Sequence, residues 1–386
     1  MATCVAAQSS QSGSMLMAQE LANPALGGRA KFGFIACTVG VDIEAMRRQL
    51  GALLPGVPFV GVTSCKSVIG SGKLLRGPIA ATALWLCGDD VKAAVVSQAV
   101  TAAEPVMGRT LVQAALGALG GTPSFALFHA TPGVEEPLLR GIAADLQATI
   151  PLLGGSAADD DLSGRWSVFT QDARLTSGAA LALVKWPGKV AAPWVSGAMS
   201  TDLQGVVTRA SGRTIYEIDG EPAALVYDRW TGGALGASLL KGDLILSKTT
   251  MTPLGVQRAS GITLVHPERV VLPSKGIATF AEVGQGETVM MVRSTAMGMK
   301  ARPANTVARA MGELGLAPSG LKGVLLVYCA GCMLAIEEST EAMVAGLKSV
   351  CANAPIVGAF YLGEQGCHSP GKPEHGNLMT GALLLG

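Results

Sequence analysis

The chain of 386 residues contains three copies of one strand–helix–strand pattern, and this repetition limits its fold more than any other feature. The copies occupy residues 32–86, 124–184 and 323–385. Each begins with a short aliphatic run, continues with helical spacing, returns to an apolar run, and passes through a polar or glycine-rich loop to a third apolar run. Because self-similarity of this kind signals internal duplication, we expect three related units.

The pattern predicts an α/β protein in which repeated β-α-β-β units form mixed sheets with helices packed on them. Residues 186–318 contain several short β-type runs separated by Gly, Pro and Ser, and they predict a β-rich central region. We expect a flexible, Ser/Ala/Gln-rich arm at 1–30 and an α/β domain of two units at 31–200. A domain at 201–386 would combine the β-rich region with the third unit.

Polar side chains gather where the predicted strands end, and in open α/β sheets ligands bind beyond the carboxyl ends of the strands. Three of these side chains, Cys37, His129 and Cys329, follow the first strand of each copy, and we expect them to become neighbours around one cavity. Hydroxyls, thiols, an imidazole and a few acids suit a small polar ligand in a mostly apolar cleft. The candidate strand-end residues are Cys37, Thr63, Ser64, Cys65, His129, Ser156, Asp159, Cys329, Tyr361 and Glu364.

The sequence Gly154-Gly155-Ser156 ends the second strand of the middle copy. Glycine turns let backbone N–H groups approach an anion closely, so Gly155 and Ser156 are candidate ligand contacts. The alternative is a tight turn that leads into an acidic, solvated loop. Both interpretations stay open at this point.

Eight cysteines are scattered through a long chain, which indicates a reducing, cytoplasmic environment and no disulfide scaffold. The pair Cys329 and Cys332 has three interpretations. With Cys367 and His368 it would form a zinc-type ligand set. At a strand–helix junction it would instead give a thiol of lowered pKa for redox chemistry. The third interpretation is that both side chains simply pack beneath the helix.

Several stretches resemble the FIST domain family. The C-terminal half of that family is similar to Tyr328-Cys329-Ala330-Gly331, to residues 355–358, to Gly363-Glu364 and to His375-Gly376-Asn377. The stretches GVTSCKS and GGSAADD resemble its N-terminal half, YEIDGEPAAL resembles the start of its C-terminal half, and the resemblance covers roughly residues 31–386.

The resemblance implies an intracellular sensory domain that binds small ligands such as amino acids, with Gly363, His375 and Asn377 near the pocket. One bacterial branch of the family binds haem, and a eukaryotic branch carries an F-box and recruits substrates for ubiquitination; no F-box is apparent here. Cys332 stands where the family often has Arg, and Lys66-Ser67 stand where it often has Gly-Glu. These departures put the family's anchoring of a carboxylate in doubt.

Charge and hydropathy exclude two classes of partner. With 29 Lys and Arg against 28 Asp and Glu, and no basic cluster, the chain has no electrostatic surface for nucleic acid. The mean hydropathy of +0.41 raises the question of a membrane. The apolar run near the C-terminus, residues 323–336, is shorter than the roughly 20 residues of a spanning helix. We therefore expect a soluble protein that does not enter a membrane.

The sequence carries no G-x-S-x-G elbow, H-E-x-x-H, Walker loop or dinucleotide fingerprint. We expect a non-enzymatic small-ligand sensor for signal transduction, with a downstream protein partner and with an amino acid or similar polar molecule as ligand. Four alternatives stay open: a haem sensor that uses His129 or Cys329, a zinc sensor, a thiol-dependent enzyme or redox sensor that pairs Cys329 or Cys65 with His129, and a substrate-recruiting adaptor.

Overall fold

Three units of one architecture form the body of the protein, as the repetition predicts. The computed structural model describes residues 2–258, 261–368 and 372–386. The first unit contains β1 (Thr3–Ser9), α1 (Ser14–Gly28), β2 (Ala30–Cys37), α2 (Ile43–Leu53), β3 (Phe59–Thr63), β4 (Ser67–Gly70), β5 (Lys73–Arg76) and β6 (Ala81–Cys87). The second contains β7 (Lys92–Ala99), α3 (Pro105–Leu119), β8 (Phe125–Ala130), α4 (Glu135–Asp145), β9 (Leu152–Ser156), β10 (Val168–Thr170), β11 (Arg174–Leu175) and β12 (Gly178–Lys185).

The third unit is interrupted by an inserted subdomain. The unit contains β13 (Val190–Ala191), β14 (Trp194–Val195), α8 (Ala296–Glu313), β23 (Gly323–Cys329), α9 (Ala330–Ala335), α10 (Thr340–Cys351), β24 (Ile356–Tyr361), β25 (Gly363–Cys367), β26 (Pro373–Gly376) and β27 (Thr380–Leu385). Two 3-10 turns, Pro318–Gly320 and Glu337–Ser339, join its elements. The mixed sheets with helices packed on them confirm the predicted α/β class.

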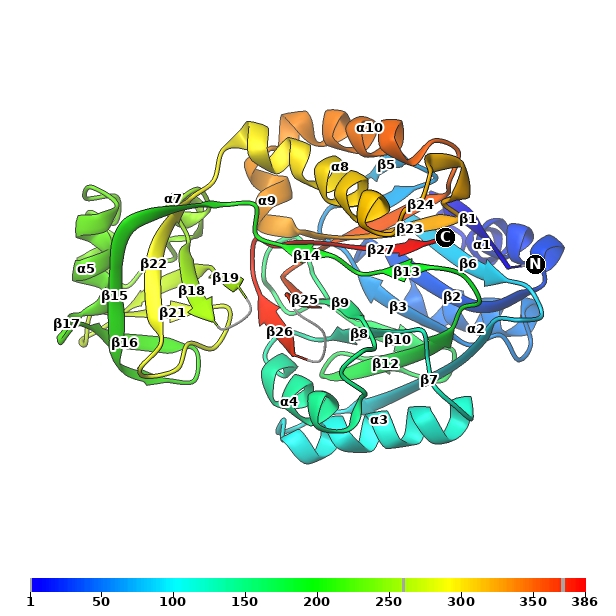
Figure 1. Ribbon diagram of the computed structural model, residues 1–386, viewed down its shortest axis with the longest axis horizontal. Coiled ribbons are helices and arrows are strands. Elements are labelled where there is room, and N and C mark those ends of the chain that lie inside the picture. The colour runs from blue at the N-terminus through cyan, green and yellow to red at the C-terminus, as the bar shows by residue number, and fades with distance from the viewer. Residues whose placement is uncertain (1, 259–260, 369–371) are drawn as a thin grey trace.

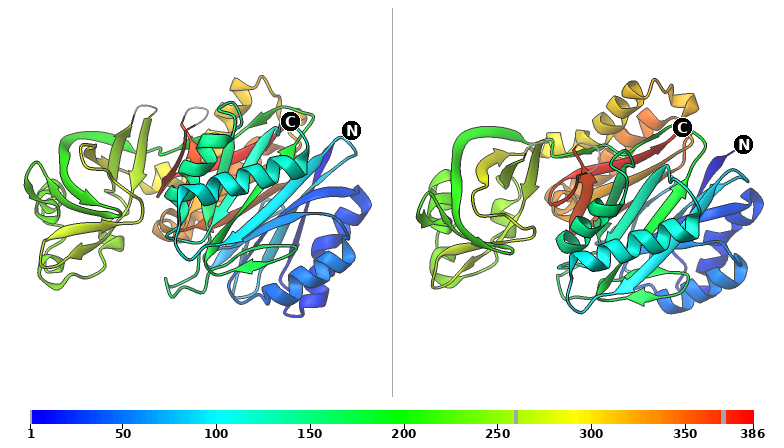
Figure 2. Two further views of the ribbon diagram at one scale, coloured as in Figure 1. Left: turned by 90° about the horizontal axis from the view of Figure 1, so that it is seen from below. Right: turned by 60° about the horizontal axis from the view of Figure 1, so that its bottom comes forward.

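The inserted subdomain is the β-rich region expected from the sequence. It contains β15 (Met199–Ser211), β16 (Thr214–Ile218), β17 (Glu221–Pro222), α5 (Ala223–Trp230), α6 (Ser238–Lys241), α7 (Leu246–Thr249), β18 (Leu254–Arg258), β19 (Gly261–Val265), β20 (Pro267–Val271), β21 (Gly276–Thr279) and β22 (Thr288–Arg293). Its own apolar core includes Val207, Ile215, Tyr227 and Val289. It stands to one side of the three-unit body in every view (Figures 1 and 2).

The N-terminal arm expected at 1–30 is instead folded, because β1 and α1 belong to the first unit. Strand β1 pairs with β6, and α1 buries Met17, Leu21 and Ala25 along one face. Trp85 Nε1 donates to the Leu21 carbonyl oxygen at 2.8 Å. The Ser/Gln/Ala-rich composition of this stretch gave no indication of the buried apolar face.

The three units exchange hairpins in a closed ring. The hairpin β10–β11 of the second unit extends the first unit's sheet through β3, and β25–β26 of the third extends the second unit's sheet through β9. The hairpin β4–β5 of the first unit extends the third unit's sheet through β24. No unit therefore completes its own sheet.

Backbone hydrogen bonds close the same ring at the points where the chain crosses between sheets. Ala158 N donates to Thr63 O at 2.9 Å, Leu362 N to Ser156 O at 3.1 Å, and Cys65 N to Phe360 O at 3.1 Å. The helices cover the outside of the three sheets (Figure 1), and apolar side chains of all three units fill the centre. The ring thus brings the loops after β3, β9 and β24 to one end of the body.

Two glycines of α3 test how tightly the outer helices pack. A Cβ at Gly108 would lie 2.1 Å from the Leu138 carbonyl oxygen of α4, whereas a Cβ at Gly117 would meet nothing within 4 Å. We expect Gly108→Ala to destabilise the fold by about 1–3 kcal/mol, because backbone must move. Gly117→Ala should stabilise it by up to about 1 kcal/mol, because alanine favours the helix. Equilibrium unfolding in urea measures both, and similar effects at the two positions would contradict the close helix contact.

Candidate functional site

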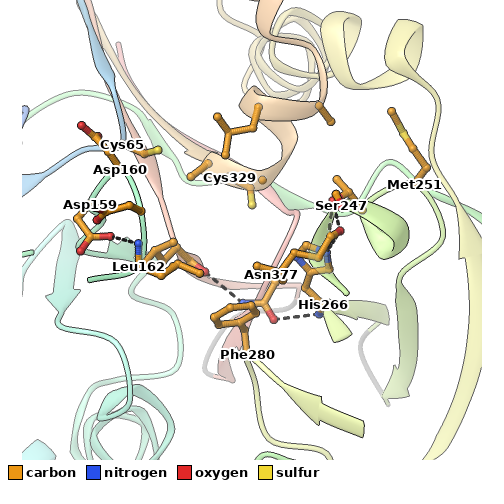
Figure 3. A pocket seen from close by; sticks show the side chains of 18 residues that line it. Cys65, Asp159, Asp160, Leu162, Ser247, Met251, His266, Phe280, Cys329 and Asn377 are labelled. Carbon is orange, nitrogen blue, oxygen red and sulfur yellow. Dashed lines mark hydrogen bonds between the residues drawn. The ribbon is translucent and has the colours of Figure 1, made fainter. Parts of the chain in front are cut away.

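A cavity of about 460 Å³ lies where the strand-end loops of the body meet the inserted subdomain. The first unit contributes Cys65 after β3, and the second contributes residues 159–162 after β9. The third contributes Cys329 at the end of β23 and Leu362 after β24. Figure 3 shows Cys65 and Asp160 on one side of the cavity, His266 and Ser247 on the other, and Cys329 between them. All three units and the insertion therefore share one cavity.

The two cavity cysteines are neutral thiols. Burial, together with the nearby Asp160 carboxylate, raises the pKa of Cys65 to about 12. Burial also raises the pKa of Cys329 well above its ordinary value, and its contact with Cys332 adds to this effect. Cys332 in turn donates to the Leu378 carbonyl oxygen at 3.6 Å. The thiols of this site are packing groups and weak hydrogen-bond donors, not thiolate nucleophiles.

The acidic loop after β9 has two different roles. Asp159 holds the loop together, because its carboxylate accepts from the N–H groups of Leu162 at 2.7 Å and Gly164 at 2.8 Å. Asp160 Oδ1 accepts from Lys66 N at 2.6 Å and so joins the second unit to the first. The Lys66 ammonium lies 3.6 Å from Glu337 Oε1 and does not line the cavity.

The insertion supplies a wall that sequence reasoning missed, and His266 is its main polar residue. The His266 ring Nε2 lies 3.2 Å from the Leu246 carbonyl oxygen, and burial lowers its pKa to about 4, so the ring is neutral at pH 7. Its backbone N–H donates to Asn377 Oδ1 at 3.2 Å, which ties the insertion to the body. His266 follows a β-type run far from the repeats. The chain has only four histidines, and this scarcity is the one sequence signal that could have pointed to His266.

Of the sequence-derived candidates, only some line this cavity: Cys65, Asp159, Cys329 and Asn377. Cys37 packs on the opposite face of its sheet, in the core beneath α1 and α2. The strand registers explain the difference. The partner of Cys37 in the neighbouring parallel strand lies two residues after Gly61. The partner of His129 lies one residue after Gly154, and the partner of Cys329 lies three residues after Gly358. The three positions are therefore not equivalent, and they do not surround one cavity.

His129, Tyr361 and Glu364 form a buried polar layer behind the cavity. The rings of His129 and Tyr361 stack with centroids 5.8 Å apart, and Phe34 lies 5.3 Å from the same imidazole. Burial lowers the pKa of His129 to about 4 and raises the pKa of Glu364 well above its ordinary value. Met379 N donates to Glu364 Oε2 at 2.9 Å. For His129 and Glu364, burial therefore favours the neutral form.

The remaining candidates hold the ring of units together. Ser156 donates to Glu135 Oε1 at 2.5 Å and accepts from Gln365, whose amide lies 2.9 Å from His375 Nδ1. Ser64 donates to the Ser67 carbonyl oxygen at 2.6 Å and accepts from Phe360 N at 2.8 Å. The others have similar positions: Thr63 bonds to Ser167, Gly155 lies under the Tyr361 ring, and Gly363 lies against His375.

The four zinc candidates lie apart. Cys329 lines the first cavity, with Cys332 beside it, whereas Cys367 and His368 line a second cavity next to Trp194. Within residues 2–258, 261–368 and 372–386, no group of three or more His, Cys, Asp or Glu side chains is arranged to hold a metal ion. The geometry does not assemble the zinc set.

Comparison with known protein families identifies the family of this chain. Residues 31–221 match the FIST N domain and residues 223–367 match the FIST C domain. The chain belongs to the FIST family. FIST domains are regarded as small-ligand sensory domains, and the family comparison finds no F-box in this chain. A search of curated proteins gives no match.

Two solved structures show only distant similarity to this FIST protein. A cyanuric acid hydrolase from A. caulinodans is 12% identical over 99% of both chains, with a TM-score of 0.38. Phosphoribosylformylglycinamidine synthase II from Thermotoga maritima is 11% identical over 99% of this chain and 72% of its own, with a TM-score of 0.22. In the described part of the FIST protein, no helix has the length and apolar character needed to cross a membrane.

The two residues expected from the sequence to bind haem, His129 and Cys329, do not fit that group. His129 lies between two aromatic rings outside the cavity, and its Nδ1 is 3.3 Å from the Gly155 carbonyl oxygen. The Cys329 thiol is neutral, whereas an axial cysteine ligand of haem is a thiolate.

The buried imidazole of His129 should make this FIST protein sensitive to acid. Burial lowers the His129 pKa from 6.5 to about 4, so the unfolded chain gains a proton before the folded one does. Stability should therefore fall between pH 6.5 and pH 4, with His129 contributing up to about 3 kcal/mol of that loss. In His129→Phe, which keeps a ring in the stack, urea unfolding should show a smaller loss over this window. Equal losses in the two proteins would show that His129 titrates normally.

Proposed function

We propose that this FIST protein senses a small molecule that binds in the first cavity, between the body and the inserted subdomain. The observation that carries the proposal is the convergence of three strand-end loops and the insertion on one cavity of about 460 Å³. That volume is typical of small-molecule sites, which are mostly apolar with a few placed polar groups. Apolar side chains such as Met251, Phe280 and Leu334 line it beside the polar groups of Asn377 and Thr250.

The charge of the lining favours a ligand with an amine. No lysine or arginine among the described residues lines the cavity, whereas Asp160 does. Asp160 has no ion pair within the described part of the chain, and one of its oxygens is engaged only by the Lys66 N–H. A protonated amine would supply the missing positive charge. The preferred ligand is thus an amino acid with a large apolar side chain, or the related amine.

The position of the cavity supports a role in signal transduction. A ligand there would contact the body through Cys329 and the insertion through His266 and Phe280. Such a ligand stabilises the arrangement in which the two parts are closest, and so shifts the population of their relative positions. A downstream protein partner that contacts the insertion would detect this shift.

Ligand binding is tested by thermal unfolding with three related probes: L-phenylalanine, phenethylamine and 3-phenylpropionate. We expect the first two to raise Tm and the third, which lacks the amine, to leave it unchanged. Asp160→Asn should weaken binding about tenfold or more, because a charged hydrogen bond is lost.

A matched pair of tryptophan substitutions locates the site. Ser247 is exposed at the cavity, and Ser247→Trp should block it, whereas Leu240→Trp on the same subdomain lies outside the lining. Binding should be lost in the first variant and kept in the second. Binding that survives Ser247→Trp, or a wild-type protein that responds to none of the amines, would refute the assignment.

Thiol reactivity separates this sensor from the thiol-dependent alternatives. Seven of the eight cysteines are buried and only Cys367 is partly exposed. Because burial raises the pKa of Cys329 and Cys65, iodoacetamide at pH 7.5 should modify Cys367 first and leave both cavity thiols intact, as read by mass spectrometry. Cys329→Ser should keep ligand binding within a few-fold. Rapid alkylation of Cys329 in the native protein would instead favour redox or nucleophilic chemistry.

A further inference from the structure

A second, larger cavity of about 930 Å³ lies on a different side of the third unit. Helix α8 forms one wall with Arg302 and Arg309, and the segment after β14 contributes Gly197. The edge of the insertion at Gly261 and the end of β25 with His368 complete it. The residues that line this cavity and those that line the first are different sets.

Arg302 is a buried cation without an ionic partner. Only 5% of the residue is exposed. Its Nη1 donates to the Leu378 carbonyl oxygen at 2.7 Å, while its Nε has no acceptor among the described residues. No described carboxylate lies within ion-pair distance of it, although its charge acts on the buried Glu364 carboxyl and opposes the rise in the Glu364 pKa that burial causes. An unpaired charge in such a place is unfavourable for folding, so this arginine destabilises the fold unless it has another partner.

The other groups of the second cavity do not supply that partner. Glu313 is occupied by Arg309, whose Nε lies 2.8 Å from Glu313 Oε1. Burial lowers the pKa of His368, which keeps the ring neutral at pH 7. Trp194 adds a second buried donor, Nε1, that also lacks an acceptor among the described residues. Among the described residues, the cavity therefore has two buried N–H donors, Arg302 Nε and Trp194 Nε1, that lack acceptors.

Glycine at position 197 leaves room for the guanidinium. Its backbone is left-handed, with φ of 58°, and a Cβ there would lie 2.5 Å from Arg302 Nε. A larger residue would displace the arginine side chain. The unpaired Nε of Arg302 thus lies against a segment that lines the cavity.

We propose that the second cavity binds a small oxyanion, a carboxylate or a phosphate, on Arg302. Guanidinium groups bind both chemistries through two parallel N–H···O bonds. The anion would satisfy Nε and neutralise the buried charge. The site is separate from the amine site proposed above and does not depend on it.

The test measures Tm of the full chain with inorganic phosphate and with malonate, against sodium chloride at matched ionic strength. We expect one or both oxyanions to raise Tm more than chloride does. Arg302→Met, which keeps the apolar stem, should abolish this difference, and Arg309→Met on the same helix should keep most of it. The proposal fails if neither oxyanion exceeds chloride, if Arg302→Met responds like the wild type, or if Arg309→Met loses the response completely.

A second variant keeps the test decisive if Arg302→Met does not fold. Gly197→Ala should move the guanidinium and weaken oxyanion binding by at least about tenfold in isothermal titration calorimetry. Ser247→Trp, which blocks only the first cavity, should keep wild-type oxyanion affinity. An unchanged affinity in Gly197→Ala would overturn the proposal even if amine binding at the first cavity were established.

Discussion

The cyclic exchange of hairpins is the interaction on which the rest of this structure depends. Each of the three sheets of the body ends in strands that another unit supplies, so the edge that would otherwise be exposed is paired. The crossing points lie directly after β3, β9 and β24, and three backbone hydrogen bonds fix them to one another. These crossings also carry Cys65, residues 159–162 and Leu362, which line the first cavity. The cavity is therefore a geometric consequence of how the three sheets close.

Closing the body in this way places polar groups where water cannot reach them. His129, Tyr361 and Glu364 lie behind the cavity, and burial shifts the pKa values of the first and the last in opposite directions. Burial thus favours the neutral form of both groups. Asp160 lines the first cavity and Arg302 lines the second, and the charge of Arg302 also acts on the Glu364 carboxyl, where it opposes the effect of burial on the pKa.

The repeated pattern was sufficient to predict three units, the α/β class and a cavity at the strand ends, because these follow from local periodicity. The pattern did not predict which face of its strand each side chain would occupy. A shift of one residue in register reverses the face of a strand, which is why Cys37 lies against helices while Cys329 lines the cavity. The hairpin exchange and the role of His266 rest on pairings between distant segments, and no single stretch of sequence contains that information.

The segment 377–379 connects the two cavities. Asn377 lines the first and accepts from His266 N, while the Leu378 carbonyl oxygen accepts from Arg302, which lines the second. Only one peptide group separates these two contacts. An oxyanion that reorients Arg302 would alter the hydrogen bond from Arg302 to the Leu378 carbonyl oxygen. A ligand in the first cavity that displaces Asn377 would move the same stretch of backbone. Coupling between two sites is reciprocal by thermodynamic necessity, so any effect of one ligand on the affinity of the other cavity would be equal in the reverse direction. If both proposed ligands bind, this short segment would be a single element on which both act.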